Sequence, residues 1–199
     1  STGREDDYVD RLSAAVQEDP ANAVAVERLI AVWRRGGAIG LRAQHILETL
    51  HFDAIPTPVH LLLGAAALER ALPIVARRHF EEALRLDPES PEAANNLAWL
   101  LTHFEPLDVD RALTLVNPVI ARFPNRPPVL QTRGHALAML GRWQEACQDF
   151  ETLQILQQDD PAVHEALAEC YDHLDKAEQA EAQRRFAQKL IAAKAERSE

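Results

Sequence analysis

The sequence holds little cysteine and little glycine, and both scarcities narrow the classes of protein it can belong to. Two cysteines, Cys147 and Cys170, occur among 199 residues, too few for a disulfide framework or a four-thiolate zinc site. We interpret both as free, packed thiols, with a single disulfide as the alternative in an exported protein. The only glycine-rich stretch, GGAIG, lacks the lysine of a phosphate-binding loop and therefore indicates a turn between helices.

Clustered positive charge and long apolar runs are also missing. The 31 acidic residues outnumber the 21 Lys and Arg, which are dispersed, and the formal net charge is −10. We expect no nucleic-acid partner, because phosphate neutralisation needs a basic stripe. No segment approaches the roughly 20 apolar residues of a membrane span, and the acidic start STGREDDYVD lacks the parts of a secretory signal. We expect no direct membrane insertion by this chain.

The sequence does not decide whether the protein belongs to the cytoplasm or to the periplasm. The chain begins with Ser rather than Met, so we expect it to be a fragment of a longer protein, with a signal, an anchor or another domain removed upstream.

Catalytic and metal-binding signatures are absent as well. There is no Walker loop, dinucleotide glycine fingerprint, HExxH or nucleophile elbow, so we predict no enzyme activity, no catalytic residue and no cofactor. The eight histidines show no ligand spacing. His164 and His173 lie nine residues apart on one predicted helix, which places them on opposite sides at about 100° per residue. We therefore expect no metal site.

What the sequence does have is an internal repeat of small residues. One series, with steps of 34, 36 and 34 residues, comprises Gly64, Ala98, Gly134 and Ala168. A second series, with steps of 36, 34 and 34 residues, comprises Ala76, Ala112, Ala146 and Ala180. Small residues let two helices approach closely, and apolar residues at three- and four-residue spacing fill the space between them. The pattern predicts stacked pairs of helices.

This period, with Pro88 and Pro124 near the ends of two units, resembles the tetratricopeptide repeat (TPR) family, whose unit is a helix pair of about 34 residues. The resemblance covers residues 57–194 and departs from the family pattern at Gln158 and Ala192, which replace the terminal proline. It implies an all-α fold, a right-handed superhelical array of antiparallel helix hairpins, which is a TPR-like α-solenoid.

The repeat period divides the chain into five segments. They are divergent N-terminal helices at 1–56 (a half repeat plus one degenerate helix pair) and TPR-like repeats at 57–90, at 91–126 with a two-residue insertion, at 127–160, and at 161–199 with an extended C-terminal capping helix. Arg133 stands at a position where the pattern expects a core aliphatic residue. A charge at such a position either has a carboxylate partner, for which we expect Glu165 or Glu169 on the following repeat, or extends outward to solvent.

The first helices of the last three repeats share a polar and aromatic face, which we name the binding stripe. It lies about 200° away from the packed Leu97 and Leu101. The binding stripe comprises Asn95, Trp99, His103, Gln131, His135, Met139, Glu165, Glu169 and His173. In TPR proteins, the resemblance implies, the first helices line a concave surface and side chains of this phase face a bound peptide. An exposed Trp is typical of binding hot spots, and amide side chains can bond an extended peptide backbone.

The sequence thus predicts a non-catalytic protein-protein interaction scaffold that binds a peptide or protein segment in a concave groove. The first repeat presents Leu61 and Ala65 on this face, whereas the last presents Glu165 and Glu169. A partner with an apolar anchor and a basic residue would be complementary. Two alternatives stay open: a self-assembling structural module that forms a homo-oligomer, and a docking arm of a larger enzyme or of an envelope or secretion complex.

Overall fold

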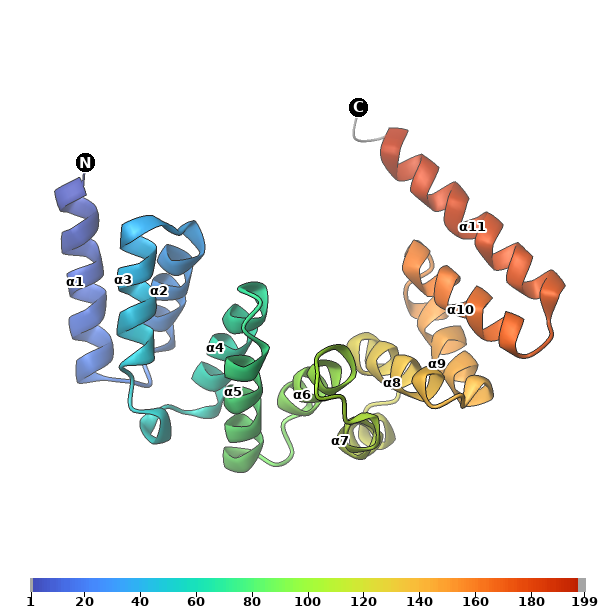
Figure 1. The fold of residues 1–199 in the computed structure, drawn as a ribbon, viewed down its shortest axis with the longest axis horizontal. Coiled ribbons are helices and arrows are strands. Elements are labelled where there is room, and N and C mark those ends of the chain that lie inside the picture. The colour runs from blue at the N-terminus through green and yellow to red at the C-terminus, as the bar shows by residue number, and fades with distance from the viewer. Residues whose placement is uncertain (1, 197–199) are drawn as a thin grey trace. The chain divides into compact units, whose positions relative to one another are not determined.

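The structure is a computed structural model that describes residues 2–196, without the side chain of Thr2, and every regular element in that range is a helix. These elements are eleven α-helices and one short 3-10 helix, and Figure 1 labels the α-helices in chain order. The predicted all-α class is confirmed. The chain forms two compact units, Ser1–Ala93 and Ala94–Glu199.

The first unit is built from antiparallel helices around an aliphatic core. Its elements are α1 Thr2–Glu18, α2 Ala23–Arg35, α3 Gly37–Glu48, η1 Phe52–Ala54, α4 Thr57–Glu69 and α5 Pro73–Leu86. Helix α2 packs against α1, α3 and α4, and α4 packs against α5. Val26 and Leu29 of α2 are fully buried in this core. The predicted turn between α2 and α3 is made by Gly36 and Gly37, whose φ angles of 73° and 69° favour glycine, and the remainder of GGAIG lies in the first turn of α3.

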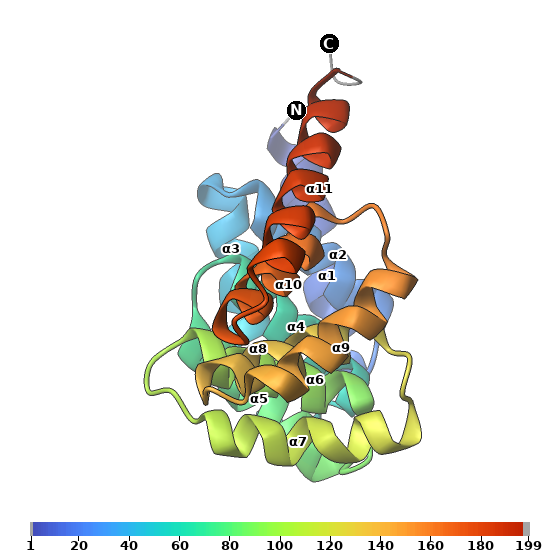
Figure 2. The same ribbon diagram turned by 90° about the vertical axis from the view of Figure 1, so that its right-hand side faces the viewer.

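The second unit continues as a chain of packed neighbours. Its helices are α6 Pro91–His103, which begins in the first unit, α7 Val109–Arg122, α8 Pro127–Met139, α9 Trp143–Leu156, α10 Pro161–His173 and α11 Ala177–Glu196. Helix α8 packs against α7 and α9, and α10 packs against α9 and α11. Figure 2 shows the longer α11, in red, running past the end of α10. Asp108 and Asp160 cap α7 and α10 by accepting hydrogen bonds from backbone N–H groups of the first turn.

Close approach within two hairpins depends on glycine. A Cβ atom added to Gly64 of α4 would lie 2.5 Å from Cε1 of Phe80 on α5. One added to Gly134 of α8 would lie 2.8 Å from Cζ of Phe150 on α9. Both distances are shorter than carbon atoms tolerate, so each phenylalanine ring fills the space that a side chain at the glycine would occupy. The small residues therefore act as predicted in these two pairs.

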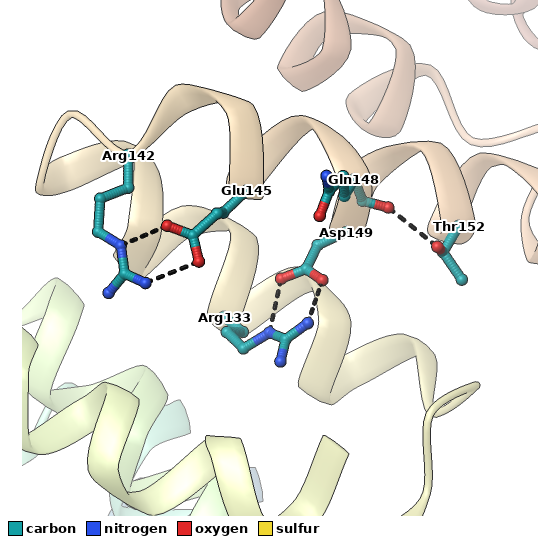
Figure 3. Close-up of polar contacts among 6 residues, drawn as sticks. All are labelled: Arg133, Arg142, Glu145, Gln148, Asp149 and Thr152. Atoms are coloured by element: carbon teal, nitrogen blue, oxygen red, sulfur yellow. Dashed lines mark hydrogen bonds and ion pairs between the residues drawn. The ribbon is translucent and has the colours of Figure 1, made fainter. Parts of the chain in front are cut away.

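Arg133 has a different partner from the one predicted. It lies on α8 and is paired with Asp149 of α9, within the same hairpin, as Figure 3 shows. The expectation of Glu165 or Glu169 on the following repeat is wrong. The acidic side chain that can reach Arg133 lies across its own hairpin, next to Phe150, where the two helices are in contact.

The two thiols are packed in the second unit. Cys147 on α9 and Cys170 on α10 are buried and free. Burial raises the pKa of the Cys147 thiol to about 11 and that of Cys170 to about 12. Both are therefore protonated and weakly nucleophilic at neutral pH, in line with the interpretation as packed thiols.

Candidate protein-binding surface

Three members of the binding stripe form a stack of aromatic rings that joins two first helices. Trp99 and His103 are four residues apart on α6, and their ring centroids are 4.3 Å apart with planes inclined by 19°. His103 continues the stack onto His135 of α8, at 4.8 Å and 30°. The edge of the stack is closed by Phe104, which meets Trp99 at 5.8 Å in an edge-on contact. The structure thus brings together residues that the sequence placed on separate repeats.

The orientation of His103 is fixed by its own helix. Its Nδ1 atom lies 2.8 Å from the carbonyl oxygen of Trp99. Because a carbonyl oxygen only accepts, Nδ1 carries the proton and donates it, which leaves Nε2 of the neutral ring as an acceptor. The same carbonyl also accepts from the hydroxyl of Thr102 at 2.9 Å.

The stack is half-buried at Trp99 and exposed at His103 and His135. Desolvation against its neighbours lowers the pKa of His135, and the nearby His103 lowers it further, while the charge of Glu169 on α10 acts in the opposite direction. His135 is therefore neutral at pH 7, and it lies within the electrostatic reach of Glu169.

The amide side chains of the stripe flank the ring stack. Asn95 lies one turn before Trp99 and is partly buried, and its Oδ1 atom is buried without a hydrogen-bond donor from any residue that the structure describes. Gln131 lies one turn before His135 on α8 and is exposed. Met139 ends α8 with 40% of its surface exposed. An acceptor without a partner is uncommon in a folded protein and costs stability.

The acidic end of the stripe lies on α10 beside a pocket. The pocket has a volume of ≈ 400 Å³ and is lined by Glu165, Ala168, Glu169, Asp172, Arg184, Ala187 and Gln188. Asp172 is paired with Arg184 across the hairpin of α10 and α11. Glu165 and Glu169 are exposed and have no ion-pair partner within residues 2–196.

His173, the last member of the stripe, makes a separate contact. Its ring stacks on Trp143 at the start of α9, with centroids 3.7 Å apart and planes inclined by 5°. The sequence pattern did not single out Trp143, because the corresponding positions of the other repeats hold Pro73, Val109 and Ala177. Thr102, whose hydroxyl group bonds the same carbonyl oxygen of Trp99 as His103 does, also has no threonine at the corresponding positions of the other repeats.

Two negative observations limit the chemistry of the chain. Over the range described, His, Cys, Asp and Glu side chains form no group of three or more that could hold a metal ion. None of the helices described there has the length and apolar character needed to cross a membrane.

Comparison with known proteins identifies the class. The family model described as tetratricopeptide repeat matches residues 57–193, close to the span of the resemblance found from small residues and period. The chain belongs to the tetratricopeptide repeat family, and it is a protein-binding module of the scaffold type that this family comprises. No curated protein matches the sequence.

Among solved structures, the chain is similar to several of the protein MamA. A MamA structure from AMB-1 in a P212121 crystal has a TM-score of 0.69 and 25% identity, covering 84% of this chain and 97% of that chain. One from MSR-1 has a TM-score of 0.67 and 24% identity, with 84% and 95% covered. MamA 41-end from Desulfovibrio magneticus RS-1 has a TM-score of 0.64 and 14% identity, with 97% and 98% covered. The likeness confirms the fold of sequential helix hairpins.

Proposed function

We propose that the chain is a non-catalytic scaffold that binds a peptide or protein segment through the binding stripe on α6, α8 and α10. The observation that carries this proposal is the stack of Trp99, His103 and His135. It presents rings from two repeats on one face, and two of the three rings are exposed. Large rings that are exposed yet ordered are typical of binding surfaces rather than of surfaces that only keep a protein in solution.

The stack favours binding for an energetic reason. Because the rings hold one another in place before a partner arrives, little side-chain freedom is lost when it does. Trp99 provides apolar contact area of the kind that dominates binding energies. Asn95 carries an acceptor that has no partner in the protein itself, and a peptide N–H can satisfy it after a rotation of the amide.

The test is a selection from a phage-displayed library of random peptides, followed by calorimetric titration of the enriched peptides. The variant is the double substitution Trp99→Ala, His135→Ala, with its fold checked by circular dichroism. A matched control is Gln144→Ala, Gln148→Ala, which removes two exposed side chains of α9 outside the stripe. Loss of one hot-spot residue typically weakens binding by about 2 kcal/mol or more.

We expect peptides that bind the parent and the α9 control equally and that bind the stripe variant at least about 10-fold more weakly. Equal binding to all three proteins would move the binding surface elsewhere. Absence of any enriched peptide would remove peptide binding by this surface from consideration.

A second candidate function, self-association, is favoured by the apolar side chains of α11. Phe186 and Ile191 are 47% and 49% exposed, although the ring of Phe186 also contacts His164 of α10 at 4.6 Å between centroids. Sedimentation at rising protein concentration tests it, with Phe186→Ser, Ile191→Ser as the variant. A mass that rises with concentration in the parent but not in the variant would support assembly through α11, and a monomer at all concentrations would exclude it.

A further inference from the structure

We infer that the partner segment presents an arginine to the binding stripe, with its guanidinium group against the ring stack of His103 and His135 and paired with Glu169. This inference rests on the proposed function and adds to it the chemistry of the partner. Three independent features of the surface match the three ways in which a guanidinium group interacts, which are charge, planar stacking and directed donation.

The first feature is charge. Glu169 is exposed and has no ion-pair partner among the residues described, although the adjacent Asp172 has one in Arg184. Glu169 occupies on α10 the position that His135 occupies on α8, and its charge acts to raise the pKa of His135. Glu165, one turn earlier on α10, adds a second carboxylate without a partner. A cation at this point would be attracted by both carboxylates.

The second feature is the stack itself. The ring centroids of His103 and His135 lie 4.8 Å apart with planes inclined by 30°, and both residues are exposed. A planar guanidinium group stacks on aromatic faces as well as pairing with carboxylates, and it sheds its water more readily than an ammonium group. The pKa of His135 is lowered by burial, which favours the neutral ring there, and this permits the arrangement because a protonated ring would repel the cation.

The third feature is an available acceptor. Since Nδ1 of His103 donates to the carbonyl of Trp99 at 2.8 Å, Nε2 of the neutral ring can accept. The guanidinium group has five N–H donors in one plane, so it can bond Nε2 of His103 and the carboxylate of Glu169 while its face lies on the ring of His135. A lysine ammonium group is a compact point charge without a planar face, so it can pair with the carboxylate but cannot stack on the ring.

The direct test uses small probes and the intact chain. The acetylated and amidated forms of arginine, lysine and citrulline are titrated into isotope-labelled protein, and the imidazole signals of His103 and His135 and the indole signal of Trp99 are followed by NMR. We expect saturable shifts with the arginine probe, at an affinity about 5-fold or more above that for lysine, and no binding of citrulline, which lacks the charge.

Two variants with the same change of charge identify the carboxylate. Glu169→Gln should lower the affinity for the arginine probe about 5-fold, whereas Glu178→Gln, an exposed position at the start of α11, should leave it unchanged. Equal shifts from arginine and lysine, equal effects of the two variants, or no shifts with arginine would each overturn the inference.

The same variants separate this inference from the proposed function. If selected peptides require Trp99 and His135 but tolerate Glu169→Gln and the replacement of their arginine by lysine, the scaffold function stands and the arginine assignment fails. If no peptide depends on Trp99 and His135, the proposed function itself fails, whatever the small probes do.

Discussion

Arg133 donates two hydrogen bonds to Asp149, from Nε to Oδ2 at 2.8 Å and from Nη2 to Oδ1 at 2.5 Å. The side chain of Asp149 is only 3% exposed and that of Arg133 is 24% exposed. The bond to Asp149 raises the pKa of Arg133 above its ordinary value. A carboxylate at this depth depends on its partner, because water cannot replace the guanidinium group.

Substitution of Arg133 by Met should therefore destabilise the second unit strongly. The change leaves the carboxylate of Asp149 buried and unpaired, which costs about 3 kcal/mol. Urea denaturation followed by circular dichroism measures it. The double variant Arg133→Met, Asp149→Leu should recover part of the loss, because no buried charge remains, and its failure to do so would show that the two residues act independently.

Figure 3 also shows the matched control for this experiment. Arg142 and Glu145 make the same type of two-bond pair on the same hairpin, but their side chains are 46% and 52% exposed. Arg142→Met should leave the unfolding free energy almost unchanged, because solvent screens an exposed pair. Equal losses for the two arginine variants would contradict the role given to burial.

A methyl group at Gly134 should be costly. Gly134→Ala places Cβ against the ring of Phe150 and should destabilise the protein by about 1 to 3 kcal/mol, as overpacking does. Adding Phe150→Leu should restore part of the stability by making room. Gly3→Ala in α1, where nothing lies within 4 Å of the added atom, should give a small gain instead. Thermal unfolding of the three variants measures whether each change lowers, restores or raises the stability as expected.

The first unit contains a pair of histidines, one buried and one half-buried, that makes its stability depend on pH. Nδ1 of His60 lies 3.0 Å from Nδ1 of His79, and Phe52 packs against both rings. Since one Nδ1 must donate and the other accept, at least one of the two rings is neutral. Burial lowers the pKa of His60, and burial together with His60 and Arg78 lowers that of His79 to about 4.

The sign of the pH effect follows from these directions. In the unfolded chain both histidines take up protons near pH 6.5, whereas the folded state resists protonation until the pH is lower. Stability contributed by neutral His79 is therefore complete above about pH 6.5 and is lost as the pH falls toward about 4. We expect the unfolding free energy to fall by about 1 to 2 kcal/mol between about pH 7.5 and about pH 5.

Urea titrations of the parent and of two variants check this dependence. His79→Gln keeps a neutral hydrogen-bonding group beside His60 and should reduce the fall between the two pH values. His45→Gln, a change at an exposed histidine of α3, should leave the fall as it is. A parent protein equally stable at both pH values would show that the pair accepts protons in the folded state.

The two cysteines should be protected in the folded protein. With pKa values raised to about 11 and about 12 and buried sulfur atoms, Cys147 and Cys170 present almost no thiolate at pH 8. Iodoacetamide should label neither within the time that labels both in urea, as mass spectrometry will show. Rapid labelling of the native chain would contradict the buried placement.

The sequence was sufficient for the fold class because the deciding signal is periodic. Small residues recur at nearly constant steps wherever two helices cross, and Gly64 and Gly134 lie at such crossings in the structure. Consecutive glycines at a helix end also predict their own geometry, since Gly36 and Gly37 take the positive φ angles that other residues avoid. These features depend on neighbours in the chain and on helical phase alone.

Contacts between helices were less accessible to sequence reasoning. The partner of Arg133, the pair of His60 and His79, and the stack of His173 on Trp143 each join side chains of different helices. Which of several acidic or aromatic residues makes such a contact depends on rotamers and on the rotation of each helix, and neither repeats with the period. The stack of Trp99, His103 and His135 was accessible in part, because the phase of the binding stripe placed all three on one face.

The paired glycine and phenylalanine limit how this array can be rearranged. The hairpins of α4 with α5 and of α8 with α9 combine Gly with Phe at matched positions, whereas the other two repeats combine Ala98 with Val116 and Ala168 with Arg184. In a hybrid hairpin with alanine on the first helix and phenylalanine on the second, the alanine methyl group would collide with the phenylalanine ring. In a hybrid with glycine on the first helix and valine on the second, the smaller side chain would leave a void. Whole hairpins can therefore be exchanged or duplicated while single helices cannot, which makes the hairpin the smallest portable unit of this protein.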